Sequence, residues 1–187
     1  GSVKLAVVCR GWGGSRKNTR EIVQWNVSDD GDEASWLRAQ LPTCVRLFAG
    51  RSLAETHQLA MGYADLVLVD DGFQNPALPR TADVVVVDFN EPRTVVPSGP
   101  LREEFVALKS ADLVWHHGSE RADNIPGWLP TDTLVESKYR ISGLRRLSGN
   151  GLEIEWLRGR LVRPVCGIAR PERFSRILRE AGAEIAY

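Results

Sequence analysis

Two adjacent carboxylates, Asp70 and Asp71, directly follow an apolar run of strand length at residues 66–69. Gly72 comes next and allows the chain to turn sharply. Because ligands of parallel α/β sheets bind at the carboxyl ends of strands, we expect these acids at the mouth of a crevice. Carboxylates of this kind order hydrated Mg²⁺ in phosphoryl-transfer sites. A single Asp at a strand end is more often a turn former or a helix cap, but the pair followed by glycine favours a metal role.

A second acidic segment, Gly31-Asp32-Glu33, opens a predicted helix at residues 33–40. An Asp in a phosphoryl-transfer crevice can accept the proton of an attacking hydroxyl. Carboxylates at a helix start are also common capping groups, and for this segment taken alone the cap is the better explanation.

Arg102 follows a rigid, proline-containing turn within residues 97–103, at the start of a predicted helix over residues 101–109. A guanidinium presented in this way can hold a phosphate with two hydrogen bonds. An ordinary surface salt bridge explains the same arginine equally well, so both interpretations stay open.

Residues 167–174 run from a predicted buried strand at 162–168 into a predicted helix at 171–181. The backbone amides at such a junction can meet an anion or a nucleobase. His116 and His117 are adjacent and have no other metal ligand close in the sequence, which favours a loop pair over a metal site.

A phosphate-binding cradle is not evident in the sequence. A P-loop needs Gly-x-x-x-x-Gly-Lys-Ser/Thr, but the most similar stretch, residues 11–19, has Arg16 at the second glycine position and Asn18 after the lysine. The glycines also miss the spacing of a dinucleotide fingerprint, which gives a dehydrogenase little support. A flexible turn and a functional loop explain this stretch equally well.

Composition excludes several classes of protein. The 187 residues include 24 Lys and Arg and 24 Asp and Glu, so no net charge recruits nucleic acid. The apolar runs are too short to cross a bilayer, and the start does not resemble a signal peptide. Cys9, Cys44 and Cys166 lack metal-ligand spacing, which is typical of reduced cysteines in a cytoplasmic protein. We therefore expect a soluble chain.

Strand and helix patterns alternate along the chain and predict an α/β fold with a mostly parallel sheet flanked by helices. The apolar runs at 66–69 and 84–87 predict strands that are covered on both faces. Asn150-Gly151 between alternating segments predicts a β-hairpin in the carboxyl-terminal part. We expect a core at residues 3–118 and, packed on it, a hairpin and strand-helix part at 119–187.

Five segments, taken in order, resemble the tetraacyldisaccharide 4'-kinases, lipid A biosynthesis enzymes that use ATP to phosphorylate a membrane-embedded disaccharide. Each segment alone is weakly specific, but their common order makes the resemblance specific. The resemblance implies a P-loop-kinase-like core. The segments are residues 10–14, 31–33, 70–74, 97–102 and 167–174.

The resemblance also implies roles for single residues. Asp32 corresponds to the catalytic base at the sugar 4'-hydroxyl, with Glu33 beside it, and Asp70 and Asp71 correspond to Walker-B-like acids for Mg²⁺. Arg102 corresponds to a catalytic arginine near the phosphates. Three further residues are implied in ATP binding: Gln74, Gly167 and Arg173.

The sequence also departs from the family pattern. Family members carry a membrane anchor and a P-loop ahead of the segment at residues 10–14, and a further segment beyond the position of Tyr187. The family's tyrosine is Trp12 here, a histidine is Asn75, and an asparagine is Arg170. Since phosphoryl transfer depends on positioning and charge neutralisation, we expect the chain as printed to be weak or inactive.

Two hypotheses follow. In the first, the chain is a fragment or shortened relative of a lipid kinase, with Mg²⁺, ATP and a lipid A disaccharide precursor as its partners, located in the cytoplasm and peripherally at the inner membrane of a Gram-negative bacterium. In the second, it is a degenerate pseudoenzyme that binds a ligand or a partner through the retained scaffold. A hydrolase or a dehydrogenase is a distant third.

Overall fold

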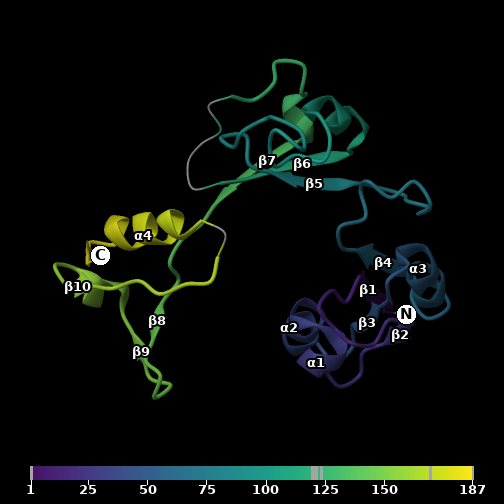
Figure 1. Cartoon of the computed structure of the whole chain (residues 1–187), viewed down its shortest axis with the longest axis horizontal. Coiled ribbons are helices and arrows are strands. Elements are labelled where there is room, and N and C mark those ends of the chain that lie inside the picture. Colours follow the sequence, from purple (N-terminus) through teal and green to yellow (C-terminus); the bar gives the residue numbers. More distant parts are fainter. Residues whose placement is uncertain (1, 119–121, 123, 169, 187) are drawn as a thin grey trace. The chain divides into compact units, whose positions relative to one another are not determined.

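The computed structural model describes residues 2–118, 122, 124–168 and 170–186. The chain divides into two compact units, Gly1–Thr81 and Ala82–Tyr187 (Figure 1). This division differs from the boundary that we expected at residue 118. The reason is that one sheet contains strands from both sides of that position.

The first unit contains a four-stranded sheet in the order β2-β3-β1-β4. The central strand β1 pairs in parallel with β3 and with β4, whereas β2 is antiparallel to β3. The strands are β1 (Leu5–Cys9), β2 (Arg20–Glu21), β3 (Arg46–Ala49) and β4 (Leu66–Val69). The helices are α1 (Val27–Asp30), α2 (Asp32–Gln40) and α3 (Leu53–Met61).

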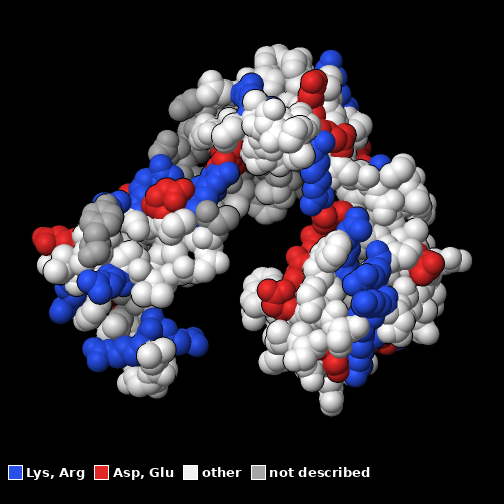
Figure 2. All heavy atoms as spheres, in the orientation of Figure 1, with Lys and Arg blue, Asp and Glu red and all other residues white. Residues whose placement is uncertain are grey.

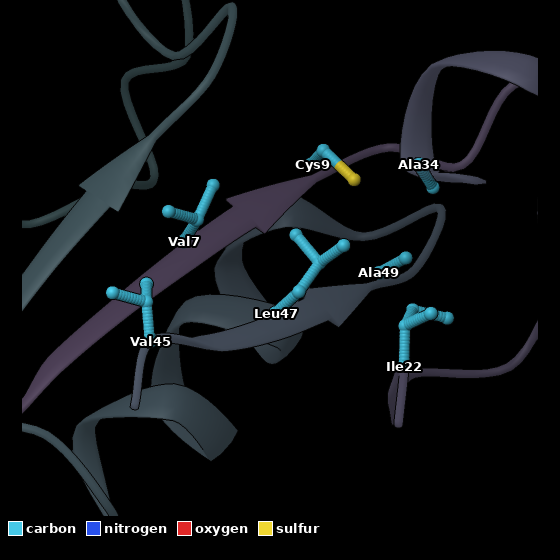
Figure 3. Close-up of a cluster of buried hydrophobic side chains, with 7 residues drawn as sticks. All are labelled: Val7, Cys9, Ile22, Ala34, Val45, Leu47 and Ala49. Atoms are coloured by element: carbon cyan, nitrogen blue, oxygen red, sulfur yellow. The ribbon is translucent and has the colours of Figure 1, made fainter. Parts of the chain in front are cut away.

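Strand β1 is apolar throughout because both of its faces are buried. Successive side chains of a strand point to opposite faces of the sheet. Val7 and Cys9 therefore join one hydrophobic cluster, which Figure 3 shows together with Leu47 of β3. Ala6 and Val8 join a second cluster on the other face, with contributions from α3. This rigid central layer holds the loops that follow β1 and β4.

The second unit contains a parallel three-stranded sheet in the order β5-β6-β7. Phe89, Leu108 and Val114 are central members of its hydrophobic cluster. The strands are β5 (Val84–Val87), β6 (Leu113–Gly118) and β7 (Leu134–Lys138), accompanied by the 3₁₀ helices η1 (Phe105–Ser110) and η2 (Thr131–Thr133).

The carboxyl-terminal part of the second unit has a small core of its own, centred on Leu157, Leu178 and Ala183. An antiparallel hairpin, β8 with β9, confirms the predicted hairpin, but its turn is at residues 146–149 and not at Asn150-Gly151, because Gly151 already pairs with Arg145 as part of β9. The elements are β8 (Leu144–Arg145), β9 (Gly151–Leu152), the 3₁₀ helix η3 (Ile154–Leu157), β10 (Leu161–Val162), α4 (Pro171–Glu180) and β11 (Glu184–Ile185).

Three expectations about single elements are wrong. The helix expected over 101–109 is the 3₁₀ helix Phe105–Ser110, and the strand expected over 162–168 ends at Val162. The strands β4 and β5 are not covered on both faces, because alternate side chains of each are exposed. Each is an edge strand with one partner among the described residues, so its side chains have fewer neighbours than those of β1.

The predicted fold class is confirmed, since most strand pairs in both units are parallel and helices accompany the sheets. In the part of the chain that the structure describes, no helix combines the length and the apolarity needed to cross a membrane.

Candidate functional site

The carboxyl edge of the first sheet carries the acidic residues singled out by the sequence. Asp70 directly follows β4, and its N–H donates to the Val8 carbonyl at 2.9 Å. Asp71 adopts a positive φ of 52°, which turns the chain immediately after the strand. Both side chains are exposed at this edge. The prediction that the two acids stand where a strand ends is therefore confirmed.

The loop after β1 packs tightly against the start of α2. Gly31 adopts a φ of 87°, and a Cβ there would lie 1.9 Å from the Trp12 carbonyl oxygen. A Cβ at Gly14 would lie 2.4 Å from the Asp29 carbonyl oxygen. Only glycine allows this approach of two backbone segments, which brings residues 10–14 and Asp32 together. This geometry favours a built functional loop over a flexible turn.

A buried ion pair holds the corner between α1 and α2. Asp30 is 2% exposed and lies 2.5 Å from the Arg20 guanidinium. The Asn26 N–H also donates to Asp30 at 2.9 Å, and Arg20 donates to the Asp29 carbonyl at 3.2 Å. Burial opposes ionisation of Asp30, but these hydrogen bonds and positive charges outweigh it and lower the pKa of the carboxyl. The pair fixes the segment from which Gly31, Asp32 and Glu33 project.

Asp32 is the first residue of α2 and is exposed. Its Oδ1 accepts a hydrogen bond from the Glu33 N–H at 2.9 Å. Asp32 thus contacts one amide of the first turn, whereas the N-cap position belongs to Gly31 and has no side-chain cap. Because Asp32 is exposed, its carboxylate is accessible to solvent.

Glu33 faces the acids that follow β4. Partial desolvation raises the pKa of its carboxyl, and the negative charges of Asp70, Asp32 and Asp71 raise it further. Burial raises the pKa of the Cys9 thiol to about 11, and the negative charges of Glu33 and Asp70 contribute to the rise. The edge therefore concentrates negative charge from two separate segments.

Arg10, directly after β1, supplies a cation at this edge. Its Nε lies 3.9 Å from Asp71 Oδ2, and the Arg10 side chain is 28% exposed. Arg10 Nε has no hydrogen-bond partner among the described residues. Sequence reasoning did not single out Arg10, although its place immediately after a strand and before a glycine cluster is the same signal that identified Asp70.

Within the described residues, no three His, Cys, Asp or Glu side chains are arranged to enclose a metal ion. Mg²⁺ does not require such a cage, because it is commonly held by one or two carboxylates with water and substrate phosphates as the remaining ligands. Asp70 and Asp71 are two exposed carboxylates of this kind, and they lie near Glu33, whose pKa is raised. The residues present therefore fit a magnesium ion of the phosphate-bound kind.

The second unit carries the other predicted site residues. Arg102 is exposed and lies three residues before the start of η1, rather than within a helix. Gly167 lies in the irregular, exposed stretch that follows β10. Gln74, in the first unit, is exposed in the turn after Asp71. The structure brings together Asp32, Glu33, Asp70 and Asp71, which all belong to the first unit.

Arg173, in the first turn of α4, contacts acids that follow β5. Its guanidinium donates to Asp88 and to Glu91, and Arg170 also pairs with Glu91. Asp88 in turn lies 4.0 Å from the ring of His116, which is fully buried and accepts a hydrogen bond from the Phe89 N–H. This cluster ties α4 to the carboxyl edge of the second sheet. The sequence signal for it was an acid after the apolar run at 84–87, the pattern already noted for Asp70.

A pocket of about 410 Å³ lies elsewhere in the first unit, at the amino ends of the strands. Lys4, Cys44, Arg46 and Tyr63 are among its lining residues. Since β1 and β3 run in parallel, this pocket lies at the amino ends of the strands and the acids lie at their carboxyl ends, on opposite sides of the sheet's length.

The order of these segments along the chain agrees with one protein family. A family model described as tetraacyldisaccharide-1-P 4'-kinase matches residues 2–187. This chain belongs to the tetraacyldisaccharide 4'-kinase family. The resemblance noted from five short segments is thereby confirmed over nearly the whole chain.

Curated relatives carry the same family name. Tetraacyldisaccharide 4'-kinase of Anaeromyxobacter dehalogenans (strain 2CP-1 / ATCC BAA-258) is 34% identical over 98% of this chain and 53% of its own length. That of Gluconobacter oxydans is 39% identical over 82% of this chain and 45% of its own. That of Neisseria gonorrhoeae is 33% identical over 98% and 54%. The chain thus spans about half the length of the 4'-kinases that it matches.

A solved structure shares the fold. The crystal structure of LpxK from Aquifex aeolicus, described as an "apo" form in complex with ATP, matches with a TM-score of 0.68 and 20% identity. The match covers 98% of this chain and 60% of that chain. The match shows that this member of the 4'-kinase family shares the fold of that structure.

Proposed function

We propose that this chain takes part in the ATP-dependent phosphorylation of the 4'-hydroxyl of a lipid A disaccharide precursor. One observation carries the proposal: in a member of the 4'-kinase family, four acids from two separate segments meet at the carboxyl edge of the first sheet. The Aquifex aeolicus relative, which is described as a complex with ATP, supports ATP as the phosphoryl donor.

In this proposal, Asp32 accepts the proton of the sugar hydroxyl. Its exposure leaves an oxygen open to substrate, while the Glu33 N–H holds the other oxygen at 2.9 Å. The buried Asp30–Arg20 pair behind it fixes the backbone from which Asp32 projects. A base held in this way is worth a factor of about 10² to 10⁴ in rate.

Asp70 and Asp71 would hold Mg²⁺, which supplies neutralisation of the phosphate charge when bound. Glu33 would support them from its position near Asp70. Arg10, 3.9 Å from Asp71, would orient that carboxylate. These assignments use only side chains of the first unit.

The family pattern supports a nucleotide-binding role for Arg102, Gln74 and Gly167, each taken by its own position in that pattern. Because Arg173 already donates to Asp88 and Glu91, its part in ATP binding would be to fix the start of α4. Location in the cytoplasm, with peripheral contact at the inner membrane, follows from a lipid substrate of this kind.

Phosphate transfer from ATP to tetraacyldisaccharide 1-phosphate tests the proposal, with the complete product of the gene and with Mg²⁺ present. Asp32→Asn should lower kcat about 10²-fold or more and leave ATP affinity unchanged, because the base does not contact the nucleotide. Asp70→Asn should weaken Mg²⁺-dependent ATP binding. Asp132→Asn, an exposed acid of the second unit, is the matched control. Wild-type rates in Asp32→Asn or Asp70→Asn would refute the assigned roles.

The second candidate is a pseudoenzyme that binds a ligand or partner. The observation that favours it is Arg170, which replaces the asparagine of the family pattern and pairs with Glu91 instead of leaving a polar group open. Nucleotide binding without phosphate transfer by the complete gene product, and an upstream coding sequence without a Gly-Lys-Thr loop, would favour this candidate.

A further inference from the structure

The segment at residues 138–163 is strongly basic in a chain whose net charge is zero. It holds seven of the 24 Lys and Arg residues but only two of the 24 Asp and Glu residues. All seven cations are exposed, and among the described residues none of them forms a salt bridge. Figure 2 shows Lys and Arg gathered where the β8–β9 hairpin lies in Figure 1. The cations are Lys138, Arg140, Arg145, Arg146, Arg158, Arg160 and Arg163.

The hairpin turn presents an apolar side chain directly beside two of these cations. Leu147, next to Arg145 and Arg146, is 111% exposed, the largest value among the exposed large hydrophobic residues. Polar residues are the usual choice at the tip of a surface turn, so a fully exposed leucine between cations and a polar turn is an unusual combination.

The turn is a built structure, and its backbone holds the leucine outward. The Gly149 N–H donates to the Arg146 carbonyl at 2.9 Å, and the Arg146 N–H donates to the Asn150 carbonyl at 2.9 Å. Gly149 has a φ of 93°, which suits a three- or four-residue hairpin loop. At the base of the hairpin, Leu144 packs against the core formed by Leu157 and Leu178. The tip is thus fixed at its base and open at its end.

We infer that the β8–β9 hairpin tip, formed by Arg145, Arg146 and Leu147, docks on the surface of an anionic lipid bilayer. The guanidinium groups would contact lipid phosphates, and the leucine would enter the boundary between headgroups and acyl chains. Nucleic acid also offers phosphates, but binding of unpaired bases uses aromatic stacking, and the tip carries no aromatic side chain. The inference gives a surface to the peripheral membrane contact of the proposed function and rests on it in that respect.

Co-sedimentation of the full chain with vesicles tests the inference. Vesicles of phosphatidylcholine with about one third phosphatidylglycerol should bind the chain, and pure phosphatidylcholine vesicles should bind it far less. Since each cation near such a surface contributes about fivefold, Arg145→Glu with Arg146→Glu should lower the partition coefficient at least about 25-fold. Leu147→Ser should lower it about fivefold. Salt should weaken binding of the wild type.

Matched controls separate the tip from net charge and from folding. Lys17→Glu with Arg51→Glu makes the same charge change at exposed positions of the first unit and should preserve most of the binding. All variants should keep the wild-type unfolding temperature, because the altered side chains are exposed. Equal loss in the control pair, equal binding to neutral and anionic vesicles, or tighter binding of an oligonucleotide through the same arginines would overturn the inference.

The vesicles contain neither ATP nor a lipid A precursor, so the outcome is independent of phosphate transfer. Asp70→Asn should bind vesicles like the wild type. Intact vesicle binding in a protein that transfers no phosphate would support the docking surface and remove the proposed function alone. Phosphate transfer without hairpin-dependent vesicle binding would support the proposed function and overturn the docking surface.

Discussion

The carboxyl group of Glu33 lies near that of Asp70, whose negative charge helps to raise the pKa of Glu33, although the two acids follow different strands of the first unit, one at the start of α2 and the other at the end of β4. Two acids that lie near each other are held there by the surrounding backbone against their mutual repulsion. The glycine contacts between residues 11–14 and Gly31, and the buried Arg20–Asp30 pair, supply that constraint.

Glu33→Gln should raise the unfolding temperature at pH 7. Because the folded protein raises the pKa of Glu33, ionisation of this carboxyl destabilises the fold. The stability of the wild type relative to Glu33→Gln should be highest below the unfolded pKa of a glutamate and should fall as pH rises through the folded pKa. Thermal unfolding between about pH 3 and pH 8 measures the difference.

Glu136→Gln, on an exposed strand position of the second unit, is the control for loss of one surface carboxylate. Addition of Mg²⁺ should reduce the gap between Glu33→Gln and the wild type, since a cation at Asp70 and Asp71 offsets the same repulsion. A Glu33→Gln unfolding temperature at or below that of the wild type at pH 7 would contradict this account.

Arg20→Ala should destabilise the protein by about 3 to 5 kcal/mol, because it leaves the buried carboxylate of Asp30 without its cation. Arg16→Ala is a matched control, since Arg16 pairs with the neighbouring Asp29 at 2.9 Å but is 57% exposed. Such an exposed pair is worth about 0 to 1 kcal/mol. Denaturant unfolding of both variants checks the prediction, and equal losses would show that burial of the pair is not the decisive factor.

The Asp30 pair also predicts acid lability. The folded pKa of Asp30 is lowered, so its contribution is present above the unfolded pKa of an aspartate and is lost as pH falls through the folded pKa. Asp30→Asn should therefore flatten the decline of the free energy of unfolding below about pH 4. An unchanged slope in that range would exclude Asp30 as a main source of acid lability.

Gly31→Ala should be far more damaging than Gly149→Ala, although both glycines have φ near 90°. At Gly31 a Cβ would lie 1.9 Å from the Trp12 carbonyl oxygen, whereas at Gly149 it would meet nothing within 4 Å. The Gly149 change should cost about 1 kcal/mol of backbone strain, and the Gly31 change several times more. Chemical unfolding measures both, and similar losses would exclude the close approach as the cause.

Arg173→Gln should lower the stability of the second unit by about 1 to 3 kcal/mol and raise the KM for ATP in the complete gene product. It removes the cation shared by Asp88 and Glu91, which are both largely buried. Arg163→Gln, an exposed arginine without a salt bridge among the described residues, should be neutral in both measurements. A KM change without a stability change would instead indicate direct contact of Arg173 with the nucleotide.

Local patterns predicted much of the first unit. Asp70 and Asp71 follow β4 as expected, and the helix expected at 33–40 is α2, from Asp32 to Gln40. These features depend on side-chain periodicity and on glycine and acid positions within a few residues, which a sequence displays directly. The order of five short motifs was also enough to indicate the family, since it does not depend on geometry.

Other features depend on residues that are distant along the chain. The short strand at Leu161–Val162 and the exposed faces of β4 and β5 depend on how many partners each strand finds, which the apolar composition of a run does not report. The contacts of Arg173 with Asp88 and of Glu33 with Asp70 arise only when separate segments meet. Periodicity is a property of neighbouring residues, so the sequence alone indicated the family and most element types of the first unit. Pairing, burial and charge repulsion are properties of contacts across the fold, so the placement and electrostatics of the acids emerged only from the folded chain.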